Sequence, residues 1–351
     1  MNNTLSKMIC TALAVGFVAA PSVFAEEAPE FSLDKVVVTA LRAETKDLDT
    51  PASVTVKTGE ELKATGATTV IDALQFTEGI AIYHQGPYGQ STGRMTSDLV
   101  IRGAKKGALI LVNGVPMNMN GLFQLDNIRL DDVEKIEIVK GSSSVMYGSD
   151  AFGGVINIFM KKEITNSISM SAGNNDQQNH SIGFQTGKLA VSGFYGKTGE
   201  VNNISAPSTA NSITSFYNYK GSEKGGINTV YSFDDKFTLY YNHTEDNINR
   251  ERVNLTTGVL MDRLNDKDRV DTVSLKYQDA QWNASLYGVY RDLDYNTKII
   301  NTYTKAKASN INNKTSKFGV DVNKNWDESN QRYLLGLTME QESYQKKDFL
   351  V

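Results

Sequence analysis

The stretch EIVKGSSSVMYGSDAFGGVINI, residues 137–158, decides the fold of the N-terminal half of the chain. Apolar, β-branched residues at both of its ends predict two short strands, and a segment rich in serine and glycine separates them. Gly141, Gly148, Gly153 and Gly154 permit tight turns and a close approach of neighbouring backbones that a Cβ would block. The pattern indicates compact packing of short strands, with glycines that are structural rather than ligand-contacting.

Residues 51–160 around this stretch have the pattern of an α+β domain. The run ASVTVKT alternates like a strand, and GEELKATGATTVIDALQF predicts two short helices with Thr58 as a possible cap. Asn113-Gly114 is a good dipeptide for a hairpin turn. Glycines at turns separate the further short strands that we expect, which are GIAIYH, DLVIRG, ALILVNGVPM, VEKIEIVKG and GGVINIFMK.

After Lys162 the pattern is almost wholly period-two, with one apolar and one mostly polar face for each strand. We expect about nine strands, near 166–174, 179–187, 189–198, 225–234, 236–246, 269–279, 281–291, 316–326 and 331–343. Short turns alternate with long polar connections, predicted at 199–224, 247–268 and 292–315.

This asymmetry is typical of an up-and-down outer-membrane barrel, which has short periplasmic turns and long outer loops. A secreted β-sandwich also alternates and stays as the alternative. Aromatic residues near strand ends would suit the interfacial girdles of a barrel. They are Tyr195, Phe233, Trp282, Tyr290 and Trp326.

The strand number favours an incomplete barrel. Bacterial single-chain barrels have even strand numbers, and an open sheet in lipid leaves unpaired backbone groups at two edges. We therefore expect residues 163–351 to be the N-terminal part of a truncated barrel.

The first residues predict export. Lys7 is the only charged side chain in residues 1–25, an apolar run follows it, and small residues end at Ala25. This is the pattern of a cleaved signal peptide. Cleavage would remove Cys10, the one cysteine, so that the mature chain could form no internal disulfide. The formal net charge of −4 does not favour nucleic acid as a partner.

The segments DLVIRGAKKGALILVNGVPMN and VEKIEIVKGSSSVMYGSDAFGGVINI resemble, in order and spacing, the plug domain of TonB-dependent outer-membrane receptors. The resemblance covers about residues 34–160, and the strands that follow are similar to the start of that family's barrel. It implies an α+β plug domain at 51–162, followed by an incomplete transmembrane antiparallel β-barrel, with about nine of an expected 22 or so strands. It also implies the outer membrane of a Gram-negative-type bacterium, with lipid as a neighbour.

The run DKVVVTA looks like the TonB box, the family's short N-terminal segment, which with its tether would occupy residues 26–50. A strand-former without an internal partner can add to a sheet edge of another protein, which would be periplasmic TonB. The alternative is a first strand of the plug. The box would comprise Asp34, Lys35, Val36, Val37, Val38, Thr39 and Ala40.

In the family, ligand meets the apices of plug loops, which map here to residues 83–98 and 117–127. The implied ligand contacts are Tyr83, His84, Tyr88, Gln90, Arg94, Asn118, Asn120, Phe123 and Gln124. Arg94 could meet an anionic ligand such as a ferric siderophore. The resemblance further implies a lock in which Arg102 and Lys140 pair with barrel glutamates beyond Val351.

The resemblance predicts energy-coupled uptake of a scarce ligand, with a ferric siderophore favoured over haem or cobalamin. A non-transporting truncated remnant and a secreted β-rich adhesin also stay open. We expect no enzyme and no cofactor, since GQSTG at 89–93 lacks the strand and helix of a nucleophile elbow. The three histidines have no metal-ligand spacing, so that no metal site is expected.

Overall fold

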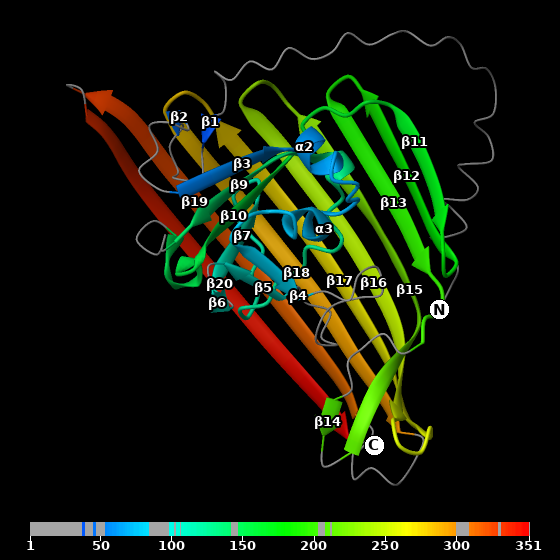
Figure 1. Ribbon diagram of the computed structural model, residues 1–351. Helices are drawn as coiled ribbons and strands as arrows, with labels where there is room; N and C mark the ends of the chain where they lie inside the picture. Colours follow the sequence, from blue (N-terminus) through cyan, green and yellow to red (C-terminus); the bar gives the residue numbers. More distant parts are fainter. Residues whose placement is uncertain are drawn as a thin grey trace, which may run out of the picture. The chain divides into compact units, whose positions relative to one another are not determined.

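The computed structural model describes residues 37–38, 45–46, 53–83, 98–101, 103–105, 107–141, 147–202, 208–210, 213–299, 309–328 and 331–350. All of them belong to one compact unit, Val37–Val351. Within it, two sheets and two short helices near the N-terminal end lie against one large antiparallel sheet (Figure 1). Among these residues no helix is long and apolar enough to cross a membrane.

The plug sheet has the strand order β3-β9-β10-β7-β8. Its central strand β10 pairs antiparallel with β9 and parallel with β7. A smaller sheet has the order β4-β5-β6. The strands are β3 (Ser53–Thr58), β4 (Ile80–Tyr83), β5 (Asp98–Ile101), β6 (Ala104–Lys105), β7 (Ala108–Val112), β8 (Val115–Pro116), β9 (Val133–Lys140) and β10 (Gly154–Met160).

The two predicted helices are present as α2 (Gly59–Lys63) and α3 (Val70–Leu74). Thr58 caps α2 as expected, in a reciprocal capping box with Glu61. Helix α3 buries its apolar face in the main plug core, beside strands β9 and β10. Two 3₁₀ turns, η3 (Leu130–Asp132) and η4 (Ser149–Ala151), precede β9 and β10.

Two turns of the plug confirm what the glycines predict. Asn113 and Gly114 both have positive φ, of 51° and 87°, which makes the β7–β8 connection a tight hairpin turn. Gly154 has a φ of 146°, and a Cβ there would lie 2.4 Å from the carbonyl oxygen of Val139. Strands β9 and β10 can therefore pack at this distance only because Gly154 has no side chain.

All nine strands predicted after residue 162 are present in the large sheet, in the order β11-β12-β13-β15-β16-β17-β18-β19-β20, with β14 paired to β15. They are β11 (Ser167–Gly173), β12 (Gln177–Thr186), β13 (Leu189–Thr198), β14 (Ser208–Ala210), β15 (Ile213–Ser232), β16 (Phe237–Asn254), β17 (Leu260–Gln278), β18 (Trp282–Ile299), β19 (Ser309–Glu328) and β20 (Gln331–Leu350).

The prediction of long loops at 247–268 and 292–315 is wrong in part. Strands β16 and β17 continue into the segment 247–268, and strands β18 and β19 continue into the segment 292–315. Strand β15 begins within the loop predicted at 199–224. A strand needs about 9–11 residues to cross a membrane, and the strands from β15 onward are 18 to 20 residues long. In the extra length the apolar–polar alternation stops while backbone pairing continues.

The register of the large sheet arranges its outward-facing side chains in rows. One row is apolar and is formed by Leu239, Leu275, Leu286, Val320 and Met339. Six residues further along β16, the corresponding row is formed by Glu245, Arg269, Asp292, Lys314 and Gln345. The outward face thus changes from an apolar band, suited to hydrocarbon, to a charged surface suited to water or headgroups.

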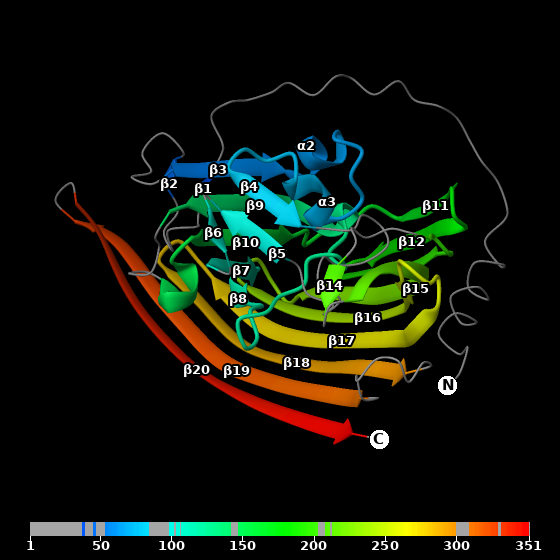
Figure 2. The same cartoon turned by 60° about the horizontal axis from the view of Figure 1, so that its bottom comes forward.

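The plug lies on the concave face of this curved sheet (Figure 2). The sheet is not closed among the described residues, since β11 and β20 stand at its two ends. This arrangement confirms the predicted fold class of a plug with part of an antiparallel barrel.

The expectation that the segment around Val37 has no internal partner is wrong. The two residues Val37–Val38 form β1 and pair antiparallel with β2, Thr45–Lys46. This pair is a separate sheet, so β1 is not the first strand of the plug sheet either. The other proposed box residues lie outside the described part of the chain.

Candidate functional site

Plug residues 117–127 bring four of the predicted ligand contacts to the inner wall of the large sheet. Asn118 is buried; its Oδ1 accepts from the Ile110 N–H at 2.8 Å and its Nδ2 donates to the Ala108 carbonyl at 2.9 Å. Phe123 is buried in the main plug core. In this conformation the Asn118 side chain supports the plug backbone, and Phe123 packs in the plug core and also lines the cavity between the plug and the wall. Their contact with a ligand stays a prediction.

The other two contacts in this segment meet the wall. Gln124 Nε2 donates to Asp246 Oδ2 at 2.5 Å. Asn120 is exposed, and its backbone N–H donates to Glu342 Oε1 at 2.7 Å. The apex is therefore joined to β16 and β20 through one side chain and one backbone group.

The first predicted ligand segment lies almost entirely outside the described residues. Tyr83 ends β4 and only its backbone is placed; His84, Tyr88, Gln90 and Arg94 are not described. The same holds for Arg102 of the expected lock. Lys140 ends β9, and its side chain lies within the plug, where a Cβ on Gly79 would be 3.8 Å from its Nζ. The lock therefore stays a prediction.

Beyond the apex, three arginine–aspartate pairs line the inner wall. Arg291 Nη2 donates to Asp268 Oδ2 at 2.7 Å, and its Nε to Oδ1 at 2.9 Å, which makes a bidentate pair. Neighbouring pairs join Arg250 to Asp266 and Arg252 to Asp262. The three aspartates are almost fully buried, with 1–2% of each side chain exposed.

The same stretch of wall carries one further cation and one further carboxylate that face each other. Lys224 on β15 stands opposite Asp246 in the register of β15 with β16. Around these charges lie aromatic and aliphatic side chains. Tyr219, Ile248 and Leu293 form one buried cluster with Tyr295, and Tyr217 lies under Arg250, whose Cζ is 5.9 Å from the ring centre. This stretch of wall is thus amphipathic, and its charged side chains face partners of opposite sign.

The sequence contains a signal for this wall that the prediction of a loop overlooks. Arg250 and Arg252 are two residues apart, and so are Asp266 and Asp268, with Asp262 at the same parity. Side chains two apart on a strand share a face, so each set belongs to one side of the sheet. The alternation of apolar residues ends before this segment, which is why its pattern predicts a loop.

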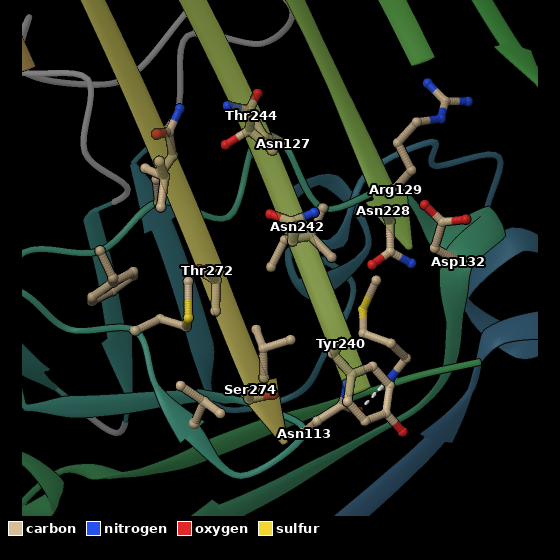
Figure 3. Close-up of a pocket in the computed structure, with 18 of the residues that line it drawn as sticks. Asn113, Asn127, Arg129, Asp132, Asn228, Tyr240, Asn242, Thr244, Thr272 and Ser274 are labelled. Carbon is tan, nitrogen blue, oxygen red and sulfur yellow. Dashed lines mark hydrogen bonds between the residues drawn. The ribbon is translucent and has the colours of Figure 1, made fainter. Parts of the chain in front are cut away.

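A small cavity of about 70 Å³, with a mostly apolar lining and several polar side chains, lies between the plug and this wall (Figure 3). Arg129 and Asp132 reach it from the plug, and Asn228, Asn242 and Thr272 reach it from the wall. A cavity of this volume holds a few water molecules and has no room for an iron chelate or a corrinoid.

Near the cavity, two neighbouring aspartates have pKa values that are shifted in opposite directions. Burial raises the pKa of Asp132 above its ordinary value. For Asp131 burial also raises the pKa, but the cations Lys63 and Arg129 outweigh it and leave the pKa lowered. Arg129 also lies over the Phe194 ring on β13, at 5.8 Å from Cζ to the ring centre, and so contacts the wall.

Among the described residues no group of three or more His, Cys, Asp or Glu side chains is placed to hold a metal ion.

Comparison with known proteins matches residues 46–155 to the TonB-dependent Receptor Plug Domain family. Among curated proteins the chain is similar to the vitamin B12 transporter BtuB of Photobacterium profundum, with 34% identity over 194 residues. That match covers 54% of this chain and 31% of the relative, so the similarity spans about a third of the relative's length.

Solved structures share the fold at low sequence identity. FpvA of P. aeruginosa, bound to a heterologous ferric pyoverdine, aligns with a TM-score of 0.60 at 13% identity, over 89% of this chain and 45% of that one. The ferric citrate transporter FecA, in its unliganded form, aligns with a TM-score of 0.59 at 14% identity, over 90% and 51% of the two chains. At this identity the likeness concerns the fold alone.

Proposed function

Since residues 46–155 match the TonB-dependent Receptor Plug Domain family, we propose that the chain is a TonB-dependent outer-membrane receptor and takes part in energy-coupled import of a scarce ligand across the outer membrane. The observation that carries the proposal is the plug itself. Its apex is hydrogen-bonded to the inner wall of a sheet whose outer face has an apolar band. A plug in this position closes the path along the wall and must move for a ligand to pass.

The energy would come from TonB, through the box at Asp34–Ala40. Backbone pairing of Val37–Val38 with Thr45–Lys46 supports an extended conformation for the centre of the box. A strand that uses one edge for this pairing keeps its other edge for a strand of TonB.

The character of the inner wall favours a large, nearly neutral and amphipathic ligand. All three of its arginines named above are paired with aspartates, so they leave no excess of positive charge for a strongly anionic chelate. Tyrosine, isoleucine and leucine side chains supply apolar contact area beside the pairs. A corrinoid fits this chemistry, and the similarity to a vitamin B12 transporter supports it.

A ferric siderophore is the second candidate, and the resemblance of the plug segments favours it. The observation behind it is Arg94 in the apical loop predicted at residues 83–98, where Asp98 at the end of the loop is the one acidic residue. Such a cation would meet an anionic chelate more readily than the paired arginines of the wall.

Uptake by cells that lack their own receptors for both ligands tests the proposal. Cells that produce the protein should accumulate labelled cobalamin, and an otherwise identical strain without TonB should not. Accumulation of a ferric siderophore instead would leave the import proposal intact and overturn the choice of ligand. Accumulation of neither, with the protein present in the outer membrane, would contradict the proposed function.

A further inference from the structure

The tip of the plug segment 117–127 is a two-residue turn. Asn120 and Gly121 have φ values of 50° and 69°, and Met119 and Leu122 exchange backbone hydrogen bonds of 2.7 and 2.9 Å on either side. Two consecutive residues with positive φ make a tight turn of the hairpin type. The backbone of this tip is thereby held in one conformation.

Two side chains of the barrel wall form hydrogen bonds with the backbone of this turn. Lys317 on β19 donates from Nζ to the carbonyl oxygen of Asn118 at 2.6 Å, although only 3% of its side chain is exposed. Glu342 on β20 accepts the backbone N–H of Asn120 at 2.7 Å. One cation and one carboxylate thus hold the groups on both sides of Met119.

Two carboxylates of the wall form ion pairs with Lys317. Lys317 Nζ lies 3.1 Å from Glu340 Oε1 and 3.4 Å from Glu342 Oε2. A buried ammonium group is costly unless it is paired, and here both partner carboxylates belong to the wall itself. Without Lys317 the two carboxylates would face each other without a shared cation.

Tyr287 on β18 completes the support. Its hydroxyl donates to Glu340 Oε2 at 2.9 Å, and its ring packs with Val115, Met119 and Val289. The ring crosses Gly319, where a Cβ would lie 2.3 Å from the ring's Cζ. The glycine therefore gives Tyr287 the space in which it positions Glu340.

We propose that Lys317 is a positioning residue: together with Glu340 and Glu342 it forms a latch that holds the plug turn 119–122 on the barrel wall and keeps the plug closed at this point. The inference rests on the proposed function in that plug movement is what the latch opposes. It differs from the expected lock, because the cation belongs to the barrel and the group that it holds is plug backbone. Substitution of plug side chains alone would leave these two bonds in place.

A cysteine at Met119 reports the state of the latch. Met119 is 2% exposed because the wall covers it, so Met119→Cys should react with a maleimide only when the turn leaves the wall. The reference is Val70→Cys, since Val70 is fully buried in the plug's own core and reacts only if the plug unfolds. Both are made with Cys10, the one cysteine of the chain, replaced by serine.

Labelling is measured in isolated outer membranes without TonB or ligand. Lys317→Met should raise the labelling rate of Met119→Cys about tenfold or more, since hydrogen bonds to charged groups are among the strong ones. Lys317→Arg, which keeps charge and donors, should restore most of the protection. The matched control is Lys324→Met on the same strand. Lys324 lies over the rings of Trp282 and Trp326, which belong to the sheet itself, so its loss should leave the plug turn in place.

An unchanged rate at Met119→Cys in the Lys317→Met protein would overturn the latch. An equal rise at Val70→Cys would also overturn it, because it would show general loosening of the plug. These readings need no transport. Wild-type cells that import no ligand would therefore count against the proposed function alone, while an insensitive Met119→Cys would count against the latch alone.

Discussion

Arg291 shows how much one buried pair contributes to this wall. Its guanidinium and the Asp268 carboxylate are nearly fully buried and form a bidentate contact. We expect Arg291→Met to lower the free energy of unfolding by about 3–5 kcal/mol, because it leaves a buried carboxylate without a partner. Urea unfolding of the protein folded into lipid vesicles measures the effect.

Arg263→Met is the matched control, on the strand next to that of Arg291. Arg263 donates to Glu251 at 2.8 Å, but 59% of its side chain is exposed. An exposed pair contributes about 1 kcal/mol or less. Equal losses for the two variants would contradict the view that the inner wall is a buried, self-paired surface.

Among the elements, two short turns of the large sheet, β15–β16 and β17–β18, are stabilised in the same way by an aspartate side chain. Asp279 Oδ1 accepts the N–H groups of Gln281 and Trp282 at 2.9 and 2.7 Å, and the Tyr277 hydroxyl donates to the same carboxylate. Asp234 accepts from the two corresponding N–H groups of its own turn, at 2.8 and 2.7 Å. In each turn the aspartate side chain thus accepts two backbone N–H groups, in the place of a backbone carbonyl.

The stabilisation of the turn by Asp279 should depend on pH. The Tyr277 hydroxyl, followed by the two backbone N–H groups, lowers the pKa of Asp279 to about 2. A lowered pKa in the folded state means that the stabilisation is complete above the unfolded value of about 3.9 and is lost as the pH falls to about 2. Above pH 5 we expect Asp279→Ala to speed hydrogen exchange at the Gln281 and Trp282 amides.

Hydrogen exchange read by mass spectrometry checks this, with the variant and the wild type compared at each pH. The two should converge between about pH 4 and pH 2, as the wild-type carboxylate takes up its proton. Asp235→Ala is the control, since Asp234 and not Asp235 accepts the bonds in the neighbouring turn. A difference at pH 2 as large as the one above pH 5 would contradict the role of the carboxylate.

The elements of the whole molecule could be predicted from its sequence to unequal degrees. Glycine spacing around Gly154 and the period-two pattern predicted the plug and all nine main strands. The outer parts of the strands were missed because no regular apolar alternation marks them, and only the shared parity of Arg250 with Arg252 and of Asp266 with Asp268 indicates a strand there. The latch could not be predicted either, since Lys317 and Asn118 are 199 residues apart and meet only through the sheet's register.

Import by the whole molecule would depend on a mechanical link from the plug to TonB. The β1–β2 pair has two residue pairs, Val37 with Lys46 and Val38 with Thr45. So short a pair is marginally stable in water and can give way to a longer strand of a partner.

The most direct measurement is capture of the detergent-solubilised protein by the immobilised C-terminal domain of TonB. We expect the wild type and Val37→Ile to be retained, since both keep the backbone donor and a β-branched side chain. Val37→Pro should be lost, because proline removes a donor that the added strand requires. Equal retention of all three proteins, or retention of none, would contradict coupling through this segment.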